Sequence, residues 1–569
     1  MQNRLGETDI KQDIQSFIAP NHPTELSLVD FGFDKEYIES TMKYIWTLHP
    51  LNPNNQTPNR PIIIYTDYDA DGITGGAILW ETLHLIGFRV FPYVPNRLSE
   101  GYGFSTVGLD KVKDKYDPSL IISVDHGIVA KNQVAYVTSK HNIPIIVTDH
   151  HNMQEDKFPT DAKSIFHIPA LSGSGVAYYV AKEIFMYGQR QNNPKFIVDW
   201  QQLERLFLED YVGLATIGTV ADLVPLQGAS RALVFHGLHN LTTTKRAGIK
   251  ALKVVAGHIG KKVTTYEVGF LLAPRINASG RLTDALDSLR LLCTHDNVKA
   301  STFAQKLNSV NIERQNMVKL AVDEAICIVE KIKETEGSLP KILIIKQNIQ
   351  TEGINATYWH EGIIGLIASK LCDKYYRPSI VLTRSENDNT IIYKASCRSI
   401  SGFHMTKYLS SLQKSLIKFG GHEAAAGLSI ESGQLDEFIQ QSKLYADTHI
   451  PDDMLIRSVA VDCQLPLHMA GIELAEAINK LSPFGMGNSR PVFVSCGAVD
   501  AVQIFGKDRT HLRFRLVDGS MSIEILAFGQ ASEYERLLRL KTNQQVVYSL
   551  DINHWNGSTR IQGKYICII

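Results

Sequence analysis

Apolar runs that end abruptly in aspartate are the feature that most constrains the fold of this chain. Each run is short, rich in β-branched residues and typical of a buried strand. The runs are residues 61–66, 120–124 and 143–148, and they end at Asp67-Tyr-Asp-Ala-Asp71, Asp125-His126 and Asp149-His150-His151. Parallel strands place their carboxyl ends along one rim of a sheet, where α/β proteins bind ligands. The pattern therefore predicts an α/β domain whose acidic and imidazole groups meet at that rim.

The first of these ends carries three alternating carboxylates, Asp67, Asp69 and Asp71. In an extended segment these side chains point to the same face, so we expect them to converge. Crowded negative charges favour a bound cation, and oxygen ligands suit magnesium and manganese. An acidic turn after a strand is the alternative reading of this stretch alone.

Two further stretches support a site that binds metal and phosphate. Residues 217–225 are apolar apart from Asp222, which we expect to have a partner or a metal, because a buried unpaired carboxylate is costly. Residues 72–76 are glycine-rich and open a helix that we expect to run to about Ile86. Glycines and a helix N-terminus at a strand-to-helix turn favour an anion such as phosphate.

The ordered motifs resemble those of the DHH phosphoesterases, and of the RecJ exonucleases in particular. The first four are Asp67-Tyr-Asp-Ala-Asp71-Gly, Asp125-His-Gly, Asp149-His-His151 and Ala221-Asp222-Leu-Val-Pro. The later ones are Pro274-Arg-Ile-Asn-Ala-Ser-Gly-Arg281, Trp359-His-Glu-Gly-Ile-Ile-Gly365, Ser396-Cys-Arg398, Gly420-Gly-His-Glu-Ala-Ala-Ala-Gly427 and Leu481-Ser-Pro-Phe-Gly-Met-Gly-Asn-Ser-Arg-Pro491. The resemblance covers the chain from about residue 55 to its end.

The fold class that we expect is α/β. Alternating strand and helix patterns predict a doubly wound parallel sheet in a DHH domain. Breaker-poor residues then predict a long helical connector, for which a coiled-coil dimer is the alternative. A second, smaller α/β domain (DHHA1) and a run of short strands follow, and the resemblance makes the strands an OB-like β-barrel. The expected segments are 1–55 (N-terminal helix and linker), 56–282, 283–338, 339–455 and 456–569.

With the resemblance in view, two metal ions are expected at the carboxylate rim, manganese or magnesium. We expect Asp69 and Asp71 to hold different ions, Asp125 to bridge them, and His150 with Asp222 to complete the second site. His151 is interpreted as a phosphate contact or transition-state stabiliser. The residues that we expect to orient these ligands from behind are Asp67 and Asp149.

Substrate contacts are expected outside the metal site. The expected pocket for a terminal 5′-phosphate is formed by Arg97, Arg281, Ser396 and Arg398, because arginine forks suit phosphate oxygens. His422 is expected to grip the scissile phosphate. The other predicted contacts are Arg275, Asn277, Gly420 and Gly421. In the barrel, a solvated outer face or a groove for single-stranded DNA would explain the alternating cations Lys507, Arg509, Arg513 and Arg515.

Composition excludes several classes of protein. The chain of 569 residues is 44% hydrophobic and 21% charged, typical of a globular protein of several domains. No apolar run approaches the roughly 18 residues of a membrane span, and the polar N-terminus lacks a signal-peptide core, so we expect a cytoplasmic location. Seven cysteines without a Cys-x-x-Cys pair indicate reduced thiols. With a net charge of −1, any DNA contact must come from a local basic surface.

The carboxylates predict metal-dependent phosphodiester cleavage, and the resemblance implies a 5′→3′ exonuclease that degrades single-stranded DNA to mononucleotides in recombination and repair. The resemblance also implies two partners, a single-strand-binding protein and a helicase, while the absence of a long heptad favours a monomer. One alternative is a phosphodiesterase for oligonucleotides or cyclic dinucleotides, or a pyrophosphatase. Another is a replication scaffold that has lost its activity.

Overall fold

The computed structural model describes residues 10–57, 59–97, 99–191, 193–347, 358–387, 390–540, 543–555 and 558–569. The polar N-terminus considered above lies partly outside these residues. The chain divides into two compact units. One contains residues 1–280, 284–306 and 460–569, and the other contains residues 281–283 and 307–459.

A five-stranded parallel sheet forms the base of the first unit, in the order β2-β1-β3-β4-β5. Its strands are β1 (Ile62–Thr66), β2 (Val90–Tyr93), β3 (Leu120–Val124), β4 (Ile145–Asp149) and β5 (Ser164–His167). All residues of the three central strands are buried, as their apolar runs predict. The doubly wound parallel sheet predicted from the sequence is confirmed.

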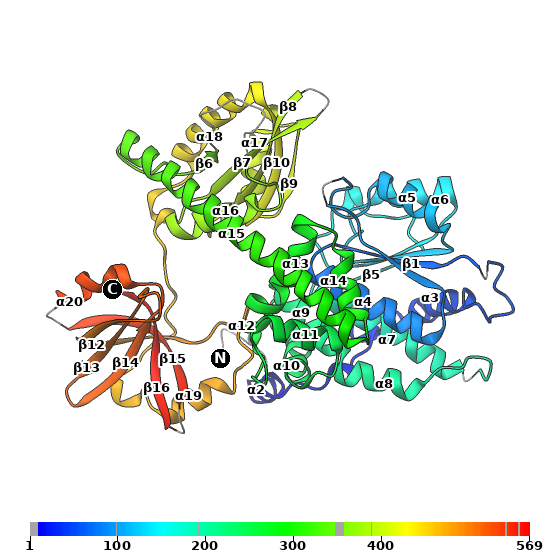
Figure 1. Cartoon of the computed structure of the whole chain (residues 1–569), viewed down its shortest axis with the longest axis horizontal. Coiled ribbons are helices and arrows are strands. Elements are labelled where there is room, and N and C mark those ends of the chain that lie inside the picture. Colours follow the sequence, from blue (N-terminus) through cyan, green and yellow to red (C-terminus); the bar gives the residue numbers. More distant parts are fainter. Residues whose placement is uncertain are drawn as a thin grey trace. The chain divides into compact units, whose positions relative to one another are not determined.

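Helices cover both faces of this sheet (Figure 1). On one face lie α5 (Thr106–Tyr116) and α6 (Lys131–His141), which share a core with Ile63 and Ile121. On the other lie α3 (Lys35–Thr47), α4 (Ala70–Ile86) and α7 (Gly173–Gln191). Helix α3 is tied to the edge strand β5, because the Tyr37 hydroxyl accepts from the backbone N–H of Ile165 at 2.6 Å.

A set of helices follows the sheet and leads out of the first unit. Their bounds are α8 (Trp200–Glu209), α9 (Tyr211–Ala221), α10 (Gly228–Thr243), α11 (Ala247–Val255), α12 (Thr265–Glu267), the π-helix η4 (Val268–Leu272), α13 (Ala273–Leu282), α14 (Leu286–Cys293) and α15 (Asn297–Glu336), and α2 (Ile10–Ile18) precedes them all. The 40-residue helix α15 is the long connector that the sequence predicts.

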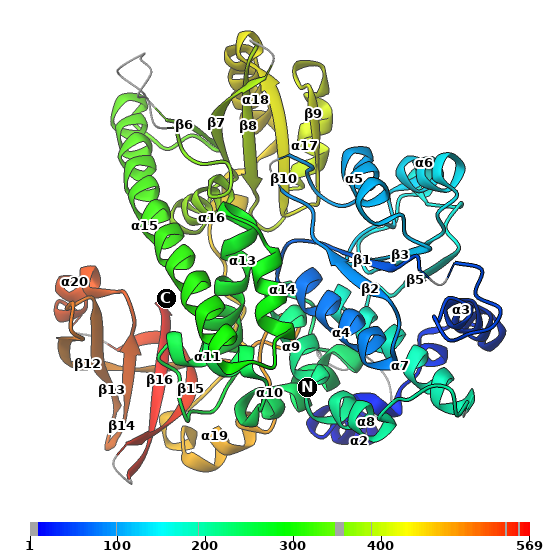
Figure 2. The same ribbon diagram turned by 45° about the vertical axis from the view of Figure 1, so that its right-hand side comes forward.

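The second unit is a mixed sheet in the order β6-β7-β8-β10-β9 (Figure 2). Its strands are β6 (Leu343–Lys346), β7 (Ser379–Asn387), β8 (Thr390–Arg398), β9 (Lys418–Gly421) and β10 (Ala425–Glu431). One face packs on α15 and α16 (Ile364–Tyr375) and the other on α17 (Met405–Ser411) and α18 (Leu435–His449). This arrangement confirms the smaller α/β fold that we predicted.

The C-terminal strands form a closed barrel, as expected for an OB-like domain. Its strands are β11 (Cys463–Gln464), β12 (Val492–Phe505), β13 (His511–Asp518), β14 (Met521–Ala527), β15 (Gln544–Trp555) and β16 (Ser558–Ile568), with helices α19 (Ile472–Asn479) and α20 (Tyr534–Leu538). Strand β12 pairs with both β13 and β15, which closes the sheet on itself. We expected two short strands in this stretch, but the structure has one long strand, β12. Its pairing with β13 is interrupted by a break in register between Asp500 and Gln503, which marks the boundary between the two expected strands.

Candidate metal centre

The metal centre begins at the turn from β1 into α4. Asp69 does not continue the strand but is the N-cap of α4, where its Oδ1 accepts from the N–H groups of Asp71 (3.0 Å) and Gly72 (3.1 Å). Asp71 therefore lies in the first turn of the helix. The expectation that Asp67, Asp69 and Asp71 alternate along one extended segment is wrong, because the helix starts two residues earlier than predicted.

Asp71 is held by the N-terminus of α7. Its Oδ2 accepts from the Gly173 N–H at 2.7 Å, and its Oδ1 accepts from the Ser174 N–H at 2.9 Å. A Cβ at Gly173 would lie 2.4 Å from Asp125 Oδ1, and a Cβ at Gly218 would lie 2.1 Å from Asp71 Oδ1. The sequence reasoning missed these two glycines, although the small residues 172–175 between a strand and a helix were an available signal.

Three carboxylates from separate elements meet around the imidazole of His150. Its Nε2 lies 3.2 Å from Asp125 Oδ1, 3.5 Å from Asp222 Oδ2 and 3.8 Å from Asp71 Oδ2. Asp125 follows β3 with φ 67, an unusual left-handed conformation for a non-glycine residue. Backbone strain of this kind persists where the surrounding structure fixes the residue. Here the strained conformation directs the Asp125 carboxylate toward His150.

Asp222 reaches the centre from a helix and not from a strand. It is the C-cap of α9, and its side chain is 35% exposed. The apolar stretch before Asp222 resembles the three strand runs in sequence, but it forms a helix. All residues of α9 from Tyr211 to Thr219 are buried, so an all-apolar pattern could not distinguish a buried helix from a buried strand.

The donor atoms form three overlapping groups, each with its atoms within 4.8 Å of one another. They are Asp67 with Asp69 and Asp125, Asp71 with His150 and Asp222, and Asp125 with His150 and His151. Asp125 belongs to two groups and lies beside the third through its 3.2 Å approach to His150. This arrangement has the form of two adjoining cation sites with a shared carboxylate.

Electrostatics support the same interpretation. Burial, followed by the charges of neighbouring carboxylates, raises the pKa of Asp67, Asp69 and Asp125 above the ordinary range, and raises that of Asp222 to about 8. Burial lowers the pKa of His150, which favours a neutral imidazole. Asp67 Oδ1, Asp125 Oδ1 and His150 Nε2 are buried without a hydrogen-bond partner. Carboxylate oxygens and a neutral imidazole fit hard to borderline divalent cations such as Mg²⁺ or Mn²⁺.

Asp149 lies behind the two histidines. Its carboxylate accepts from the N–H groups of Ile128 (2.8 Å), His150 (2.7 Å) and His151 (3.0 Å), and from His151 Nδ1 at 2.8 Å. Burial opposes ionisation of Asp149, but its hydrogen bond and charge interaction with His151 hold its pKa below the ordinary range. Burial likewise opposes protonation of His151, but Asp149 raises the pKa of His151 to about 9.

Two of the predicted substrate residues of the first unit, Arg97 and Asn277, border this centre. The guanidinium of Arg97 lies over the Tyr68 ring at 5.2 Å. Asn277 Oδ1 accepts from the Ala70 N–H at 2.7 Å, so this residue braces the start of α4. Arg275 donates to the Leu271 carbonyl at 2.7 Å.

Several predicted substrate residues lie in the second unit. On β8, the guanidinium of Arg398 donates to Ser396 Oγ at 3.2 Å and to Ser369 Oγ at 3.1 Å. Arg281 donates to the Gly362 carbonyl at 3.1 Å. Gly420, Gly421 and His422 are exposed at the end of β9. Gly421 has φ 142, and a Cβ there would meet the Ala425 carbonyl oxygen at 2.4 Å, so this turn requires glycine.

The four predicted cations of the barrel do not form one face of a strand. Lys507 and Arg509 lie in the turn before β13, where Arg509 has φ 51. Only Arg513 and Arg515 are on the strand, and Arg515 pairs with Asp500 at 2.6 Å while Arg513 bonds to Gln503 at 2.8 Å. The expected alternation stops at the turn because residues 506–510 leave the extended conformation.

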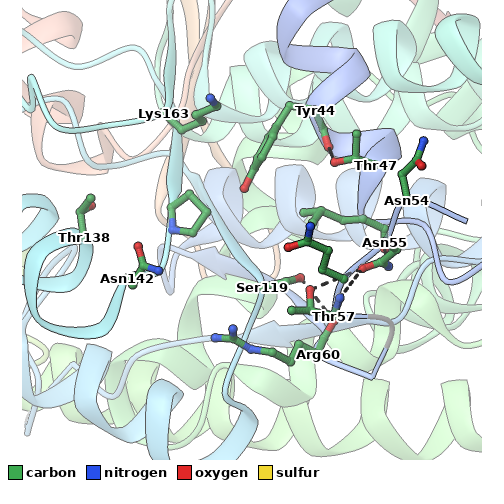
Figure 3. Close-up of a pocket in the computed structure, with 13 residues that line it drawn as sticks. Tyr44, Thr47, Asn54, Asn55, Thr57, Arg60, Ser119, Thr138, Asn142 and Lys163 are labelled. Carbon is green, nitrogen blue, oxygen red and sulfur yellow. Dashed lines mark hydrogen bonds between the residues drawn. The ribbon is translucent and has the colours of Figure 1, made fainter. Parts of the chain in front are cut away.

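A separate cavity of about 490 Å³ lies at the opposite edge of the parallel sheet (Figure 3). It is lined at the amino ends of the strands by Arg60, Ser119, Pro144 and Lys163. The metal centre is formed at the carboxyl ends, so the two sites are distinct.

Among the described residues, no helix is long and apolar enough to cross a membrane.

Comparison with known proteins agrees with this architecture. Residues 61–219 match the N-terminal domain of the DHH family, residues 346–447 match the DHHA1 domain, and residues 461–565 match the RecJ OB domain. The fold and the acidic centre thus define a DHH protein with an OB domain.

The relatives identify the family more closely. The single-stranded-DNA-specific exonuclease RecJ of Bacillus subtilis is 32% identical over 512 residues, which cover 88% of this chain and 60% of the relative. The RecJ of Salmonella typhimurium is 30% identical over 88% of this chain and 86% of its own. The chain belongs to the RecJ family. A crystal structure of RecJ in complex with Mn²⁺ from Thermus thermophilus matches with a TM-score of 0.72 and 25% identity, over 100% of this chain and 80% of that one.

Proposed function

We propose that this chain is a metal-dependent exonuclease that degrades single-stranded DNA from the 5′ end to mononucleotides. The observation that carries the proposal is the cluster of Asp71, Asp125, His150 and Asp222, in which Asp125 Oδ1 and His150 Nε2 are buried without a hydrogen-bond partner and fit divalent cations. The relatives are single-stranded-DNA-specific exonucleases, which supports DNA as the substrate and a preference for the single strand. The 5′ polarity is what the resemblance of the motifs implies. The chain spans 60% of the length of the Bacillus subtilis relative, so activity and substrate are proposals here.

Two cation sites are proposed at the centre. Asp67 and Asp69 border one site, Asp71, His150 and Asp222 border the other, and Asp125 is shared. Asp67 is thus a ligand candidate, in addition to the orienting role that we expected for it. When bound, divalent cations would stabilise the attacking and leaving oxygens of an in-line displacement at phosphorus and lower the pKa of the attacking water.

The protein's own residues prepare the centre for this reaction. Asp149 orients His150 and His151 through three hydrogen bonds, from their two backbone N–H groups and from His151 Nδ1, and a fourth bond from the Ile128 N–H fixes the carboxylate itself. Burial opposes protonation of His151, but its hydrogen bond and charge interaction with Asp149 raise its pKa, which favours the protonated imidazole. A protonated His151 would stabilise the negative charge that develops on the phosphate. The Tyr102 hydroxyl, 3.1 Å from His151 Nε2, limits the positions of the ring.

The terminal 5′-phosphate is proposed to bind Arg398, Ser396 and Arg281 of the second unit. In the first unit, Arg97 is proposed as a phosphate contact in its own right. Arg398 is preorganised by its bonds to Ser396 and Ser369, so little side-chain entropy is lost when an anion binds. His422, with Gly420 and Gly421, is proposed to contact the scissile phosphate. Arg275 stays a candidate contact, whereas Asn277 is proposed to act through the backbone of Ala70.

End-labelled DNA tests the function. A single strand labelled at the 5′ end should release labelled mononucleotide at once, while a strand labelled at the 3′ end should shorten progressively. Blunt duplex of the same sequence should resist, and EDTA should stop cleavage of every substrate. Release beginning at the 3′ end, or equal degradation of duplex, would contradict the proposed polarity or strand preference.

Two other functions remain as alternatives. An oligonucleotide or cyclic-dinucleotide phosphodiesterase would hydrolyse dinucleotides faster than long strands, and the OB domain at residues 461–565 argues against it. An inactive scaffold would lack metal-supported cleavage, but the complete donor set argues against that too. We also propose a monomer in the cytoplasm that works with a single-strand-binding protein and a helicase. Co-sedimentation and light scattering test the partners and the monomer.

A further inference from the structure

Two aromatic rings stack on each other at the surface of the first unit. The Tyr266 and Phe270 rings have centroids 4.8 Å apart and an interplanar angle of 28°, yet the residues are 60% and 65% exposed. Aromatic residues usually contribute their large apolar area to cores or interfaces. In this exposed pair, the outer ring faces are accessible to a ligand or partner molecule.

Local structure directs the pair outward. Phe270 lies in the π-helix η4, and such segments occur frequently at functional sites. Neighbouring Val268 and Leu272 are buried, and Gly269 lies against α9, where a Cβ would meet Val220 at 3.8 Å. With these residues facing the protein, Phe270 and the preceding Tyr266 face solvent.

The pair lies between the metal centre and the segment that leads into the barrel. Val220, which borders Gly269, precedes the cation candidate Asp222 by two residues. On the other side, Thr265 Oγ1 donates to the Phe484 carbonyl at 2.8 Å. The segment of Phe484 is also bound to the turn between α9 and α10, because the Leu226 N–H donates to the Met486 carbonyl at 2.8 Å.

A cavity of about 1260 Å³ continues from Tyr266 toward the barrel. Its lining includes Tyr266 and Lys262 from the first part of the chain, and Arg490 and Lys564 from the barrel domain. Asp551 is the only carboxylate among the lining residues, and it lies 2.6 Å from Lys564 and 3.9 Å from Arg490. The three cations therefore exceed it by two charges. Positive charge next to an exposed ring is the combination with which proteins bind a single-stranded nucleic acid.

We propose that Tyr266 and Phe270 form a stacking platform for unpaired bases of the DNA strand between the metal centre and the barrel. This inference rests on the proposed exonuclease function and extends it, because it names rings that favour a single strand. Bases in a duplex are stacked on their neighbours and do not present a free face to such a pair. The cations of the cavity would contact the phosphates of the same stretch, so this binding should weaken with salt.

A coupling experiment between rings and bases tests the platform. The double variant Tyr266→Leu/Phe270→Leu keeps apolar bulk and helix propensity but removes both ring faces. Binding of a 5′-phosphorylated 20-mer of dT is measured by fluorescence anisotropy in EDTA, and single abasic sites are moved along the strand. The wild-type protein should bind the intact strand about tenfold more tightly than the variant. At one or two adjacent positions, an abasic site should weaken wild-type binding and leave variant binding unchanged.

Phe91→Leu is the matched control, because Phe91 is also exposed (39%) and stacked, on Tyr116 at 5.6 Å, but lies on the edge strand β2. It should bind DNA as the wild-type protein does. The platform is refuted if the double variant binds the 20-mer within twofold of wild type, or if abasic sites weaken both proteins equally. Failure of the function itself is distinguishable, since wild-type protein would then cleave no labelled strand when Mn²⁺ is added.

Discussion

The substitution Gly218→Ala should damage the metal centre although residue 218 carries no functional side chain. A Cβ built at this position lies 2.1 Å from Asp71 Oδ1 and 2.1 Å from Ser174 Oγ. Ordinary contact begins near 3.4 Å, so one or both atoms must move by about 1.3 Å. Asp71 cannot yield freely, because the Gly173 and Ser174 N–H groups hold both of its oxygens.

The expected cost follows from that displacement. Overpacking of this kind destabilises a fold by roughly 1–3 kcal/mol, partly offset by the gain of about 1 kcal/mol when alanine replaces glycine in a helix. A misplacement of about 1 Å in a catalytic group costs on the order of 100-fold in rate. We therefore expect the rate of cleavage to fall about 100-fold while the melting temperature changes by only a few degrees.

Gly213→Ala is the control, because Gly213 lies on the same helix and a Cβ there meets the side chains of Leu241 at 3.3 Å and Asn240 at 3.8 Å, neither of which belongs to the metal centre. The assay compares single-turnover cleavage of a 5′-labelled strand over a manganese titration, with thermal melting in parallel. Gly218→Ala should need more manganese for half-maximal rate, whereas Gly213→Ala should behave as wild type. If both variants cleave at the same rate, the close packing around Asp71 does not position the centre.

Further predictions address other parts of the molecule. Asp125→Ala should reduce cleavage by several orders of magnitude, because it removes the shared carboxylate; near-normal manganese-dependent cleavage in a rate assay would contradict this role. Arg398→Ala should cost about 1.5–3 kcal/mol of affinity for a 5′-phosphorylated strand, and competition binding should find no such loss for a 5′-hydroxyl strand. EDTA should lower the melting temperature of wild type more than that of Asp125→Ala, since the buried carboxylates repel one another without a cation. The hydrogen bond to Glu81 raises the pKa of His295, so its stabilisation is complete below the unfolded pKa, about 6.5, and is lost as pH rises through the folded value. Melting temperatures of wild type and His295→Ala should therefore differ at pH 6 and converge at alkaline pH, and a constant difference would refute the link.

Much of the fold was predictable from local pattern. The runs before Asp67, Asp125 and Asp149 are fully buried strands of one parallel sheet, because continuous apolar residues between polar ends suit a strand covered on both faces. The long connector and the closed barrel were also predicted correctly. Where the sequence pattern was ambiguous, the prediction failed. An apolar stretch before Asp222 is equally compatible with a buried helix, and the alternating cations near His511 extend across a turn.

The sequence by itself determined which residue types are available for a metal centre, and tertiary structure decided how they meet. Asp71 and Asp222 are brought to one imidazole by elements 151 positions apart in the chain. Gly173 and Gly218 matter only because helices α7 and α9 approach Asp71 and Asp125 so closely that no Cβ fits. Short-range periodicity reports which face of an element is buried. The distance between side chains on different elements depends on how those elements pack, and no local pattern contains that information.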